Sequence, residues 1–461
     1  MTISRRTVLG TGLVLAAKPW RAVPNAAAAP VKAQPAVARP SSLVVPNGSV
    51  LPSTIREGVR IFHLRAEEVD HEIAPGLKIK AWGYNGSTPG PVIEAVEGER
   101  VRIYVTNALP ERTSVHWHGL FVPYGMDGVA GLTQAPIEPG KTFRYEFVLD
   151  RAGTFMDHPH ADEMTQIALG MIGMIVVHPR RPPPARERVR DFCLMSHEMT
   201  VHIGHMRPDP LAMNDFNVLT FNGKAFPGTA PLLAETGDRI RVRLGNLGPM
   251  DHHPIHLHGH AFEVVSTDGG PVPASARFPE TTVLVPAGAT RTIEFLATEG
   301  DWPLHCHMTH HAMNQMGHGA ANLIGTNTKG LDERLARIAP GYMTMGQNGM
   351  SEMAHMQMEQ PRNSISMVGG KGPHGIIDMG GMFTIVKVRD KLPAGGADPG
   401  WDRCSTCRSP RWWCRGRARH STSPSSAGCC GGGPAAGPTE RSSCFTSPPQ
   451  RCSRSDCSPG R

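Results

Sequence analysis

The chain contains one long segment twice. The sequence YNGSTPGPVIEAVEGERVRIYVTNALP (84–110) resembles FNGKAFPGTAPLLAETGDRIRVRLGNLGP (221–249). Both copies run through an Asn-Gly turn, a Pro-Gly turn, a short strand and an acidic-Gly turn. In the strands that follow, RVRIYV and RIRVRL, apolar residues alternate with polar ones, which is typical of half-buried antiparallel strands. The repeat predicts that one architecture is built twice.

The second halves of the copies also match, since PGKTFRYEFVLDRAGTFMDHPH and AGATRTIEFLATEGDWPLHCH each end in a histidine pair. Each copy holds about seven or eight short strands separated by turns, which is typical of a Greek-key sandwich. The low aromatic content of 6%, with 51 glycines and 42 prolines, suits short strands better than long helices. We therefore predict an all-β protein with two tandem β-sandwich domains, at 48–182 and 183–326.

The two ends of the chain differ from this pattern. Residues 1–30 contain paired arginines, a short apolar run and the stretch NAAAAP, which predicts a twin-arginine export signal cleaved near Ala29. A linker over 31–47 would follow. Residues 392–461 are rich in Arg, Cys, Ser, Pro and Gly and show no hydrophobic period. Translation out of frame explains this tail better than a Cys-rich module, because its cysteine spacings fit no zinc pattern well.

The formal net charge of +7 gives little support for a nucleic-acid partner. Much of the excess comes from the signal and the tail, and no platform of basic and aromatic residues accompanies it. The apolar run of the signal is too short to span a bilayer. We expect an exported protein, periplasmic or secreted, that binds no nucleic acid and has no membrane span.

Each copy carries two His-X-His pairs. Residues i and i+2 of a strand point to the same face, so each pair can present two imidazoles to one site. Four pairs at equivalent positions are a set that suits copper, zinc or iron. Scattered core or surface histidines would not repeat in this way. The pairs are His116 and His118, His158 and His160, His256 and His258, and His305 and His307.

Strand alternation also gives Cys306 a role, because it lies between two histidines that would face the other way. A thiolate there could hold a second metal on the opposite side of the strand. His253 has the parity of that side, and His311 and Met316 follow Cys306 by five and ten residues. Two histidines, one cysteine and a weak methionine form a blue-copper electron-transfer site. The first copy has Pro159 at the position of Cys306, so only the second copy is expected to hold this site.

These motifs resemble those of the multicopper oxidases, and specifically their two-domain, laccase-like branch. The matching motifs are HWHG, HPH, HPIHLHGH and HCHMTHHAMNQM, which lie within 48–326. The short interval between HPH and HPIHLH leaves no room for the extra domain of a three-domain laccase. The resemblance implies two cupredoxin-like domains and four copper ions per chain: one type 1, one type 2 and two type 3.

The resemblance also implies roles for individual residues. Asp127, in YGMDG, matches an acid that relays protons near the three-copper cluster, although an ordinary Asp-Gly turn is the alternative. Cys306 would carry electrons from the type 1 copper to the cluster. The implied ligands are His116 and His256 for type 2 copper; His118, His158, His160, His258, His305 and His307 for the type 3 pair; and His253, Cys306, His311 and Met316 for type 1 copper.

The implied activity is the one-electron oxidation of a small reductant, coupled to the four-electron reduction of O2 to water. The reductant would be a phenol, as in laccases, or Cu(I). The resemblance also implies that a two-domain chain completes its cluster against a neighbour, most naturally in a homotrimer. Residues 327–391 form a methionine-rich extension that suits Cu(I), although methionine is also adaptable apolar filler. Within it, MFTIVKVRD (382–390) predicts a closing strand.

Two other functions remain open. A copper-sequestering protein with little turnover would use the methionines, but it would not need a cysteine that bridges two sites. A copper nitrite reductase is also a two-domain trimer, but in that family the type 1 site belongs to the first domain, where this chain has Pro159. Among the remaining residues, Cys193 is expected to be a buried core thiol. His260 is not expected to be a ligand, and His311 is favoured over His310 at the type 1 site.

Overall fold

The computed structural model of the chain describes residues 32–37, 43–181, 189–315, 327, 329–340 and 360–402. The predicted export signal, the predicted ligand Met316 and the aberrant tail beyond residue 402 lie outside these ranges, as do the methionines between 343 and 358. Within the described ranges, no helix is both long enough and apolar enough to cross a membrane.

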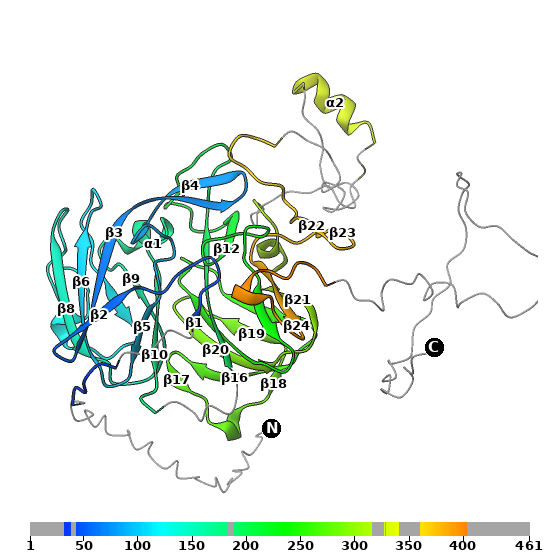
Figure 1. Ribbon diagram of the computed structural model, residues 1–461. Coiled ribbons are helices and arrows are strands. Elements are labelled where there is room, and N and C mark those ends of the chain that lie inside the picture. Colours follow the sequence, from blue (N-terminus) through cyan, green and yellow to red (C-terminus); the bar gives the residue numbers. More distant parts are fainter. Residues whose placement is uncertain are drawn as a thin grey trace, which may run out of the picture. The chain divides into compact units, whose positions relative to one another are not determined.

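The first copy of the repeat folds into one β-sandwich, shown in blue to cyan in Figure 1. One sheet has the strand order β2-β3-β6-β8, with β4 paired to β3, and the other has the order β5-β10-β9-β7. The strands are β2 (Ser53–Arg56), β3 (Val59–Ala74), β4 (Leu77–Tyr84), β5 (Ile93–Val96), β6 (Arg100–Asn107), β7 (His116–His118), β8 (Thr142–Val148), β9 (Gly153–His158) and β10 (Gly173–His178).

The second copy forms a second sandwich, green to orange in Figure 1, together with the short blue strand β1, which precedes the first copy in the chain. One sheet has the order β1-β11-β14-β20-β16-β17, with β12 and β18 at its sides, and the other has the order β13-β24-β21-β15-β19. The strands are β1 (Leu43–Val44), β11 (Val189–Met199), β12 (Val218–Phe221), β13 (Leu232–Glu235), β14 (Arg239–Asn246), β15 (His253–Leu257), β16 (Phe262–Thr267), β17 (Gly270–Pro271), β18 (Pro279–Glu280), β19 (Thr282–Val285), β20 (Thr290–Leu296), β21 (Gly300–Cys306) and β24 (Phe383–Arg389).

Helices are few and short in the described residues, so the predicted all-β class is confirmed. A two-stranded hairpin accompanies the short helices. These elements are α1 (Glu163–Ala168), α2 (Leu331–Ile338), the 3-10 turns η1 (Tyr124–Met126), η2 (Ala274–Ala276), η3 (Thr309–Ala312) and η4 (Ala394–Gly396), and the strands β22 (Lys371–Gly372) and β23 (Gly375–Ile376).

The two sandwiches repeat the same strand pairings. In the first, β3 runs parallel to β6, which is antiparallel to β8. In the second, β11 runs parallel to β14, which is antiparallel to β20. The alternation in RVRIYV appears directly as alternating burial along β6, because one face of the sheet covers the core. Register aligns the copies residue by residue, since Ala66 lies opposite Asn107 and Ser196 lies opposite Asn246.

Cys193 is buried in the core, as predicted. It lies on β11 with 1% of its surface exposed. Burial raises the pKa of its thiol well above the ordinary value. The side chain packs with Met156, Met174 and Met195 in a cluster between the two sandwiches. The domain boundaries at 182 and 326 stay predictions.

The predicted closing strand is β24, and it is an inner strand of its sheet. It lies between β13, which runs parallel to it, and β21, which runs antiparallel. The backbone N–H of Cys306 donates to the carbonyl of Met382 (3.0 Å), and that of Met382 donates to the carbonyl of His311 (2.8 Å). The chain after the methionine-rich stretch therefore supports the strand that carries the expected copper ligands.

We expect a chain that ends after Gly381 to lose the folded second sandwich. Without β24, both β13 and β21 expose unpaired backbone edges and the buried side chains of Val386 and Val388 are lost. The measurement is near-ultraviolet circular dichroism during denaturant unfolding. A chain that ends after Asp402 keeps β24 and is the control; it should unfold at the denaturant midpoint of the full chain. A native spectrum in the shorter chain would show that β24 is dispensable.

Candidate metal centre

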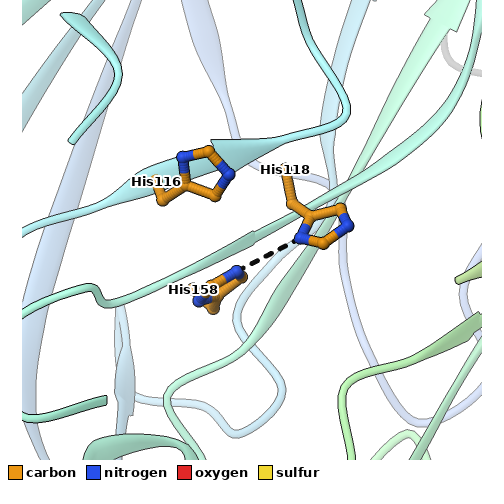
Figure 2. A group of neighbouring side chains, drawn as sticks. All are labelled: His116, His118 and His158. Carbon is orange, nitrogen blue, oxygen red and sulfur yellow. Dashed lines mark hydrogen bonds between the residues drawn. The ribbon is translucent and has the colours of Figure 1, made fainter. Parts of the chain in front are cut away.

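The histidine pairs of the first sandwich meet because β7 and β9 are neighbours. His116 lies directly opposite His158 in the antiparallel register. Figure 2 shows the rings of His116, His118 and His158 turned toward one another, and their ligand atoms all lie within 4.8 Å of each other. The Nδ1 atom of His118 is 3.3 Å from Nε2 of His158. The ring of His160 is 5.6 Å from that of His116, so all four predicted residues come together.

The second sandwich repeats this arrangement on β15 and β21. His256 lies opposite His305 in the register, as His116 lies opposite His158. The Nε2 atoms of His258 and His305 are 3.1 Å apart, and the ring of His307 is 5.4 Å from that of His256. The predicted set of this half therefore also gathers in one place.

Backbone carbonyls determine which ring nitrogen faces the group. His158 Nδ1 donates to the carbonyl of Pro159 (2.9 Å), and His305 Nδ1 donates to the carbonyl of Cys306 (2.8 Å). Because a neutral imidazole has a single N–H, each Nε2 then presents a lone pair. Burial lowers the pKa of His158 to about 3 and also lowers that of His305. Both rings are thus neutral, which is the form that binds metals.

The histidines of β7 and β15 are also oriented by hydrogen bonds to backbone carbonyls. His116 Nδ1 donates to the carbonyl of Asp127 (2.7 Å), and His256 Nδ1 donates to the carbonyl of Thr281 (2.7 Å). The Asp127 carboxylate also lies 3.5 Å from His116 Nδ1. Asp127 is therefore beside the histidines, as its predicted role requires. A carboxylate that the sequence did not indicate, Glu163 of α1, lies 3.5 Å from Nδ1 of His158.

A second group forms on the opposite side of β21. Cys306 Sγ lies 3.5 Å from His311 Nδ1 and 3.8 Å from His253 Nδ1. All three side chains have 0% exposure. Strand alternation thus places Cys306 away from its neighbouring histidines, as predicted. His310, the rival of His311, is exposed.

One buried carboxylate, Glu198, and one partly buried carboxylate, Asp251, face the far edges of these imidazoles. Glu198 Oε2 lies 3.1 Å from His253 Nε2, and Asp251 Oδ2 lies 3.3 Å from His311 Nε2. With the single N–H of each ring directed at its carboxylate, the two Nδ1 lone pairs face each other at 3.2 Å. Such a contact is repulsive unless a cation lies between the lone pairs. The donor set of two imidazoles and one cysteine sulfur therefore fits a copper ion.

Glu198 is held by further contacts. Its Oε1 accepts hydrogen bonds from the backbone N–H groups of Met250 (3.0 Å) and Asp251 (2.8 Å). Burial alone would raise the pKa of Glu198, but the hydrogen bond from His253 and these contacts hold it below the ordinary value. Burial raises the pKa of the Cys306 thiol to about 12. A bound cation is therefore needed for this sulfur to be a thiolate at neutral pH.

The duplication shows what this arrangement requires. The side-chain oxygen of Asn246 accepts from the N–H of Gly248, as that of Asn107 accepts from Leu109, each at 2.9 Å. Gly248 and Leu109 therefore occupy equivalent positions. A Cβ on Gly248 would lie 1.7 Å from Glu198 Oε2, so only glycine leaves room for the carboxylate.

The first sandwich has none of the polar ligands of the Cys306 group, which are His253, Cys306 and His311. Thr113 stands where the second copy has His253, three residues before the histidine pair, and it donates to Gln166 Oε1 (2.7 Å). Pro159 replaces Cys306, and Met164, which is 49% exposed, replaces His311. The described residues of the first copy therefore hold the histidine pairs alone, which agrees with the prediction of one mononuclear site.

The two histidine groups do not meet within one chain. His118 approaches Gly288, where its Cε1 atom is 3.7 Å from the place that a Cβ would take. Gly288 follows Val285, which pairs with His253. His256 lies three residues beyond His253 on β15, and these two residues are about 10 Å apart at the usual strand rise. Across the described residues, no ring of the first group contacts a ring of the second.

His260 is a structural residue, as predicted. It is 8% exposed, and its Nε2 lies 2.9 Å from Thr298 Oγ1 while its ring packs 5.2 Å from that of Trp302. Met316, the expected axial ligand, is outside the described residues.

Comparison with protein families decides the classification. Two multicopper oxidase models match the chain, one over residues 65–182 and one over 199–323, which together are more than half of it. The chain belongs to the multicopper oxidase family. The match of each model contains one set of histidine pairs, and the second also contains Cys306.

Individual relatives agree with this classification. Copper resistance protein A of Pseudomonas syringae pv. tomato is 39% identical over 241 residues, which cover 42% of this chain and 39% of that protein. Laccase-6 of rice is 31% identical over 257 residues, covering 49% and 40%. The crystal structure of the blue copper oxidase from Nitrosomonas europaea has a TM-score of 0.53 at 26% identity, covering 71% of this chain and 85% of that one. The chain thus spans about two fifths of the curated relatives.

Glu198→Gln tests the buried carboxylate. An amide has only one acceptor oxygen, so its NH2 must face either the backbone N–H groups of Met250 and Asp251 or the Nε2–H of His253. One donor then faces another, and we expect the free energy of unfolding to fall by about 1–3 kcal/mol. Copper affinity of the Cys306 group should fall by about 10- to 100-fold, because the partner that orients His253 is weakened. Chemical unfolding and copper competition titrations measure the two effects.

The duplicated fold supplies the control. Glu68 occupies the position of Glu198 on the equivalent strand β3, two residues after Ala66, but its side chain is 63% exposed. Glu68→Gln should change stability by less than about 0.5 kcal/mol and leave copper affinity unchanged. Equal effects of the two substitutions would show that Glu198 does not position His253.

Proposed function

We propose that this multicopper oxidase couples one-electron oxidation of a small reductant to the reduction of O2. The observation that carries the proposal is β21, which places Cys306 in one metal group and His305, with the adjoining His307, in the other. Copper held by the Cys306 group would supply a one-electron acceptor, and copper held among the paired histidines would supply the four-electron reduction of O2 to water. A sequestering protein has no use for a residue pair that joins two sites.

The chain's residues prepare each part of this path. Adjacent residues on β21 join the two groups by a short covalent route, and full burial of Cys306 excludes water from its sulfur. The carbonyl of Cys306 also accepts the Nδ1–H of His305 (2.8 Å), so the same residue orients the next ligand. Fixed carbonyl partners leave little reorganisation when charge changes at the site.

The proposed ligands follow the geometry and the family pattern. Asp127 is the proposed proton carrier on one side of the histidines, and Glu163 is a second candidate because it lies within 3.6 Å of both His158 and His160. We propose four copper ions, of which the type 1 ion is held by His253, Cys306, His311 and Met316, the type 2 ion by His116 and His256, and the type 3 pair by His118, His158, His160, His258, His305 and His307.

Cu(I) is the reductant we favour over a phenol. The match to copper resistance protein A is stronger than that to rice laccase-6. Residues before and after the methionine-rich sequence 341–359 are hydrogen-bonded to each other: the N–H of Asn314 donates to the carbonyl of Met367 (2.8 Å), and that of Ile365 donates to Gln315 Oε1 (2.9 Å). Asn314 follows the proposed ligand His311 by three residues, and thioether sulfur suits Cu(I).

A homotrimer would complete the cluster. The two histidine groups of one chain do not contact each other. The cluster would therefore form where the histidines of the first sandwich of one chain meet those of the second sandwich of a neighbour. A head-to-tail interface of this kind forms a ring where its rotation closes, and a cyclic trimer would make three identical sites. We further propose export through the twin-arginine signal at 1–30, to the periplasm or beyond.

Cys306→Ser tests the electron path. We expect loss of the blue absorption and a fall of oxygen uptake to the background rate, because a hydroxyl replaces the thiolate that joins the groups. Oxygen uptake of the copper-loaded protein is measured with Cu(I) and with a phenol, and Cu(I) should be the faster substrate. Cys193→Ser is the matched control, since Cys193 is also buried but lies away from the copper groups. It should keep the blue colour and the activity.

Mixing two inactive variants tests the shared cluster. His116→Ala damages the histidine group of the first sandwich, and His256→Ala damages that of the second sandwich. Each pure variant should therefore be inactive. After unfolding and refolding together in equal amounts, about a quarter of the interfaces in a closed ring would pair two intact groups. Oxygen uptake should return to about that fraction of the wild-type rate. No recovery, with a sedimenting mass of one chain, would contradict the shared cluster.

A further inference from the structure

The loop between β11 and β12, residues 200–217, carries imidazole and thioether side chains that the proposed oxidase centre does not use. It contains the sequence VHIGHMRPDPLAM. His202, His205, Met206 and Met213 are all at least partly exposed, and Met213 is 59% exposed. Imidazole and thioether groups are ligands that copper prefers.

The two imidazoles are spaced for one ion. The N–H of His205 donates to the carbonyl of His202 (2.9 Å), which closes a tight turn. The ring centroids are 5.9 Å apart at an interplanar angle of 73°. In the oxidase centre, the rings of His253 and His311 are 5.2 Å apart at 64°. Two metal–nitrogen bonds of about 2 Å allow ring centroids up to about 6 Å apart, so the turn fits a two-coordinate ion.

Asp209 orients one of these rings. Its Oδ2 lies 3.0 Å from His202 Nε2, and its Oδ1 accepts from the N–H of Leu211 (2.9 Å). The N–H of Asp209 in turn donates to the carbonyl of Thr200 (2.8 Å). A carboxylate on one imidazole nitrogen directs the other nitrogen toward a metal and raises its basicity. The same relation holds between Glu198 and His253.

The turn is held in place from both sides. The carbonyl of Met206 accepts from the N–H of Lys80 on β4 (2.8 Å). The carbonyl of His205 accepts from the side chain of Asn363 (2.5 Å), which also binds the backbone of Lys78. A loop fixed at its two ligand-bearing residues loses little conformational entropy on binding an ion.

We propose that His202 and His205 bind one Cu(I) ion at the surface, with Asp209 as the positioning residue and the thioethers of the loop nearby. Cu(I) is favoured over harder divalent ions because the loop offers imidazole and sulfur and because Asp209 is engaged with His202. The site is additional to the four copper ions of the proposed function and does not depend on turnover. Its place in the chain is suggestive, since the loop begins two residues after Glu198, the partner of His253.

Silver titration of the full copper-loaded protein, without oxygen, tests this site. Ag(I) has the charge and softness of Cu(I) but does not change oxidation state. The wild type should bind one more Ag(I) ion than the double variant His202→Ala/His205→Ala, while any sulfur-rich part of the chain contributes equally to both. His63→Ala removes another exposed imidazole, which stacks on Tyr104, and should bind as many ions as the wild type.

Asp209→Asn gives a second, independent readout. It keeps both imidazoles, so the number of bound ions should stay the same while the affinity of one falls by about 10- to 100-fold. Equal ion counts for the wild type and the double variant would overturn the proposal, and an unchanged affinity in Asp209→Asn would remove its positioning role. Blue absorption and phenol oxidation should be unchanged in all variants, so a failure here is distinct from a failure of the oxidase function.

Discussion

The pairing of β15 with β21 determines both metal groups of the second sandwich. One register places His256 opposite His305 and Ile255 opposite Cys306. Because neighbouring residues of a strand face opposite sides, that register gives the paired histidines one side and the cysteine the other. A slip of one residue would exchange the two sides and destroy both groups. The carbonyl that orients His256 belongs to Thr281, which precedes β19 on the other side of β15, and the one that orients His305 belongs to Cys306 itself.

Much of the centre could be predicted because its geometry depends on residues that are close together in the sequence. His-X-His spacing and strand parity need only neighbouring residues, and the repeat supplied a second copy for comparison. Glu198 could not be found in this way. It lies 55 residues before His253, and the two meet only because β11 runs parallel to β14 and brings its end beside β15. A buried carboxylate also has no sequence signature, since Glu68 at the equivalent position is exposed.

The position of the closing strand was harder to predict for the same reason. An alternating apolar stretch at 382–390 predicts a strand, but not its neighbours. Its place between β13 and β21 depends on pairings with residues 232–235 and 300–305, far away along the chain. The role of Gly248 could not be predicted from the sequence either. Its role is evident only beside the Glu198 carboxylate, and the comparison with Leu109 shows that the same loop accepts a large side chain where no carboxylate is present.

The late position of β24 in the chain has a consequence for synthesis. A ribosome completes β21 with its cysteine long before it reaches residue 383, and until then one edge of β21 has no partner. The sulfur of Cys306, which is fully enclosed in the finished fold, therefore stays open to oxidants throughout that interval. Reducing conditions during translation would protect it. The sulfur is enclosed only after the last strand is in place, so the order of the strands along the chain sets how long it needs protection.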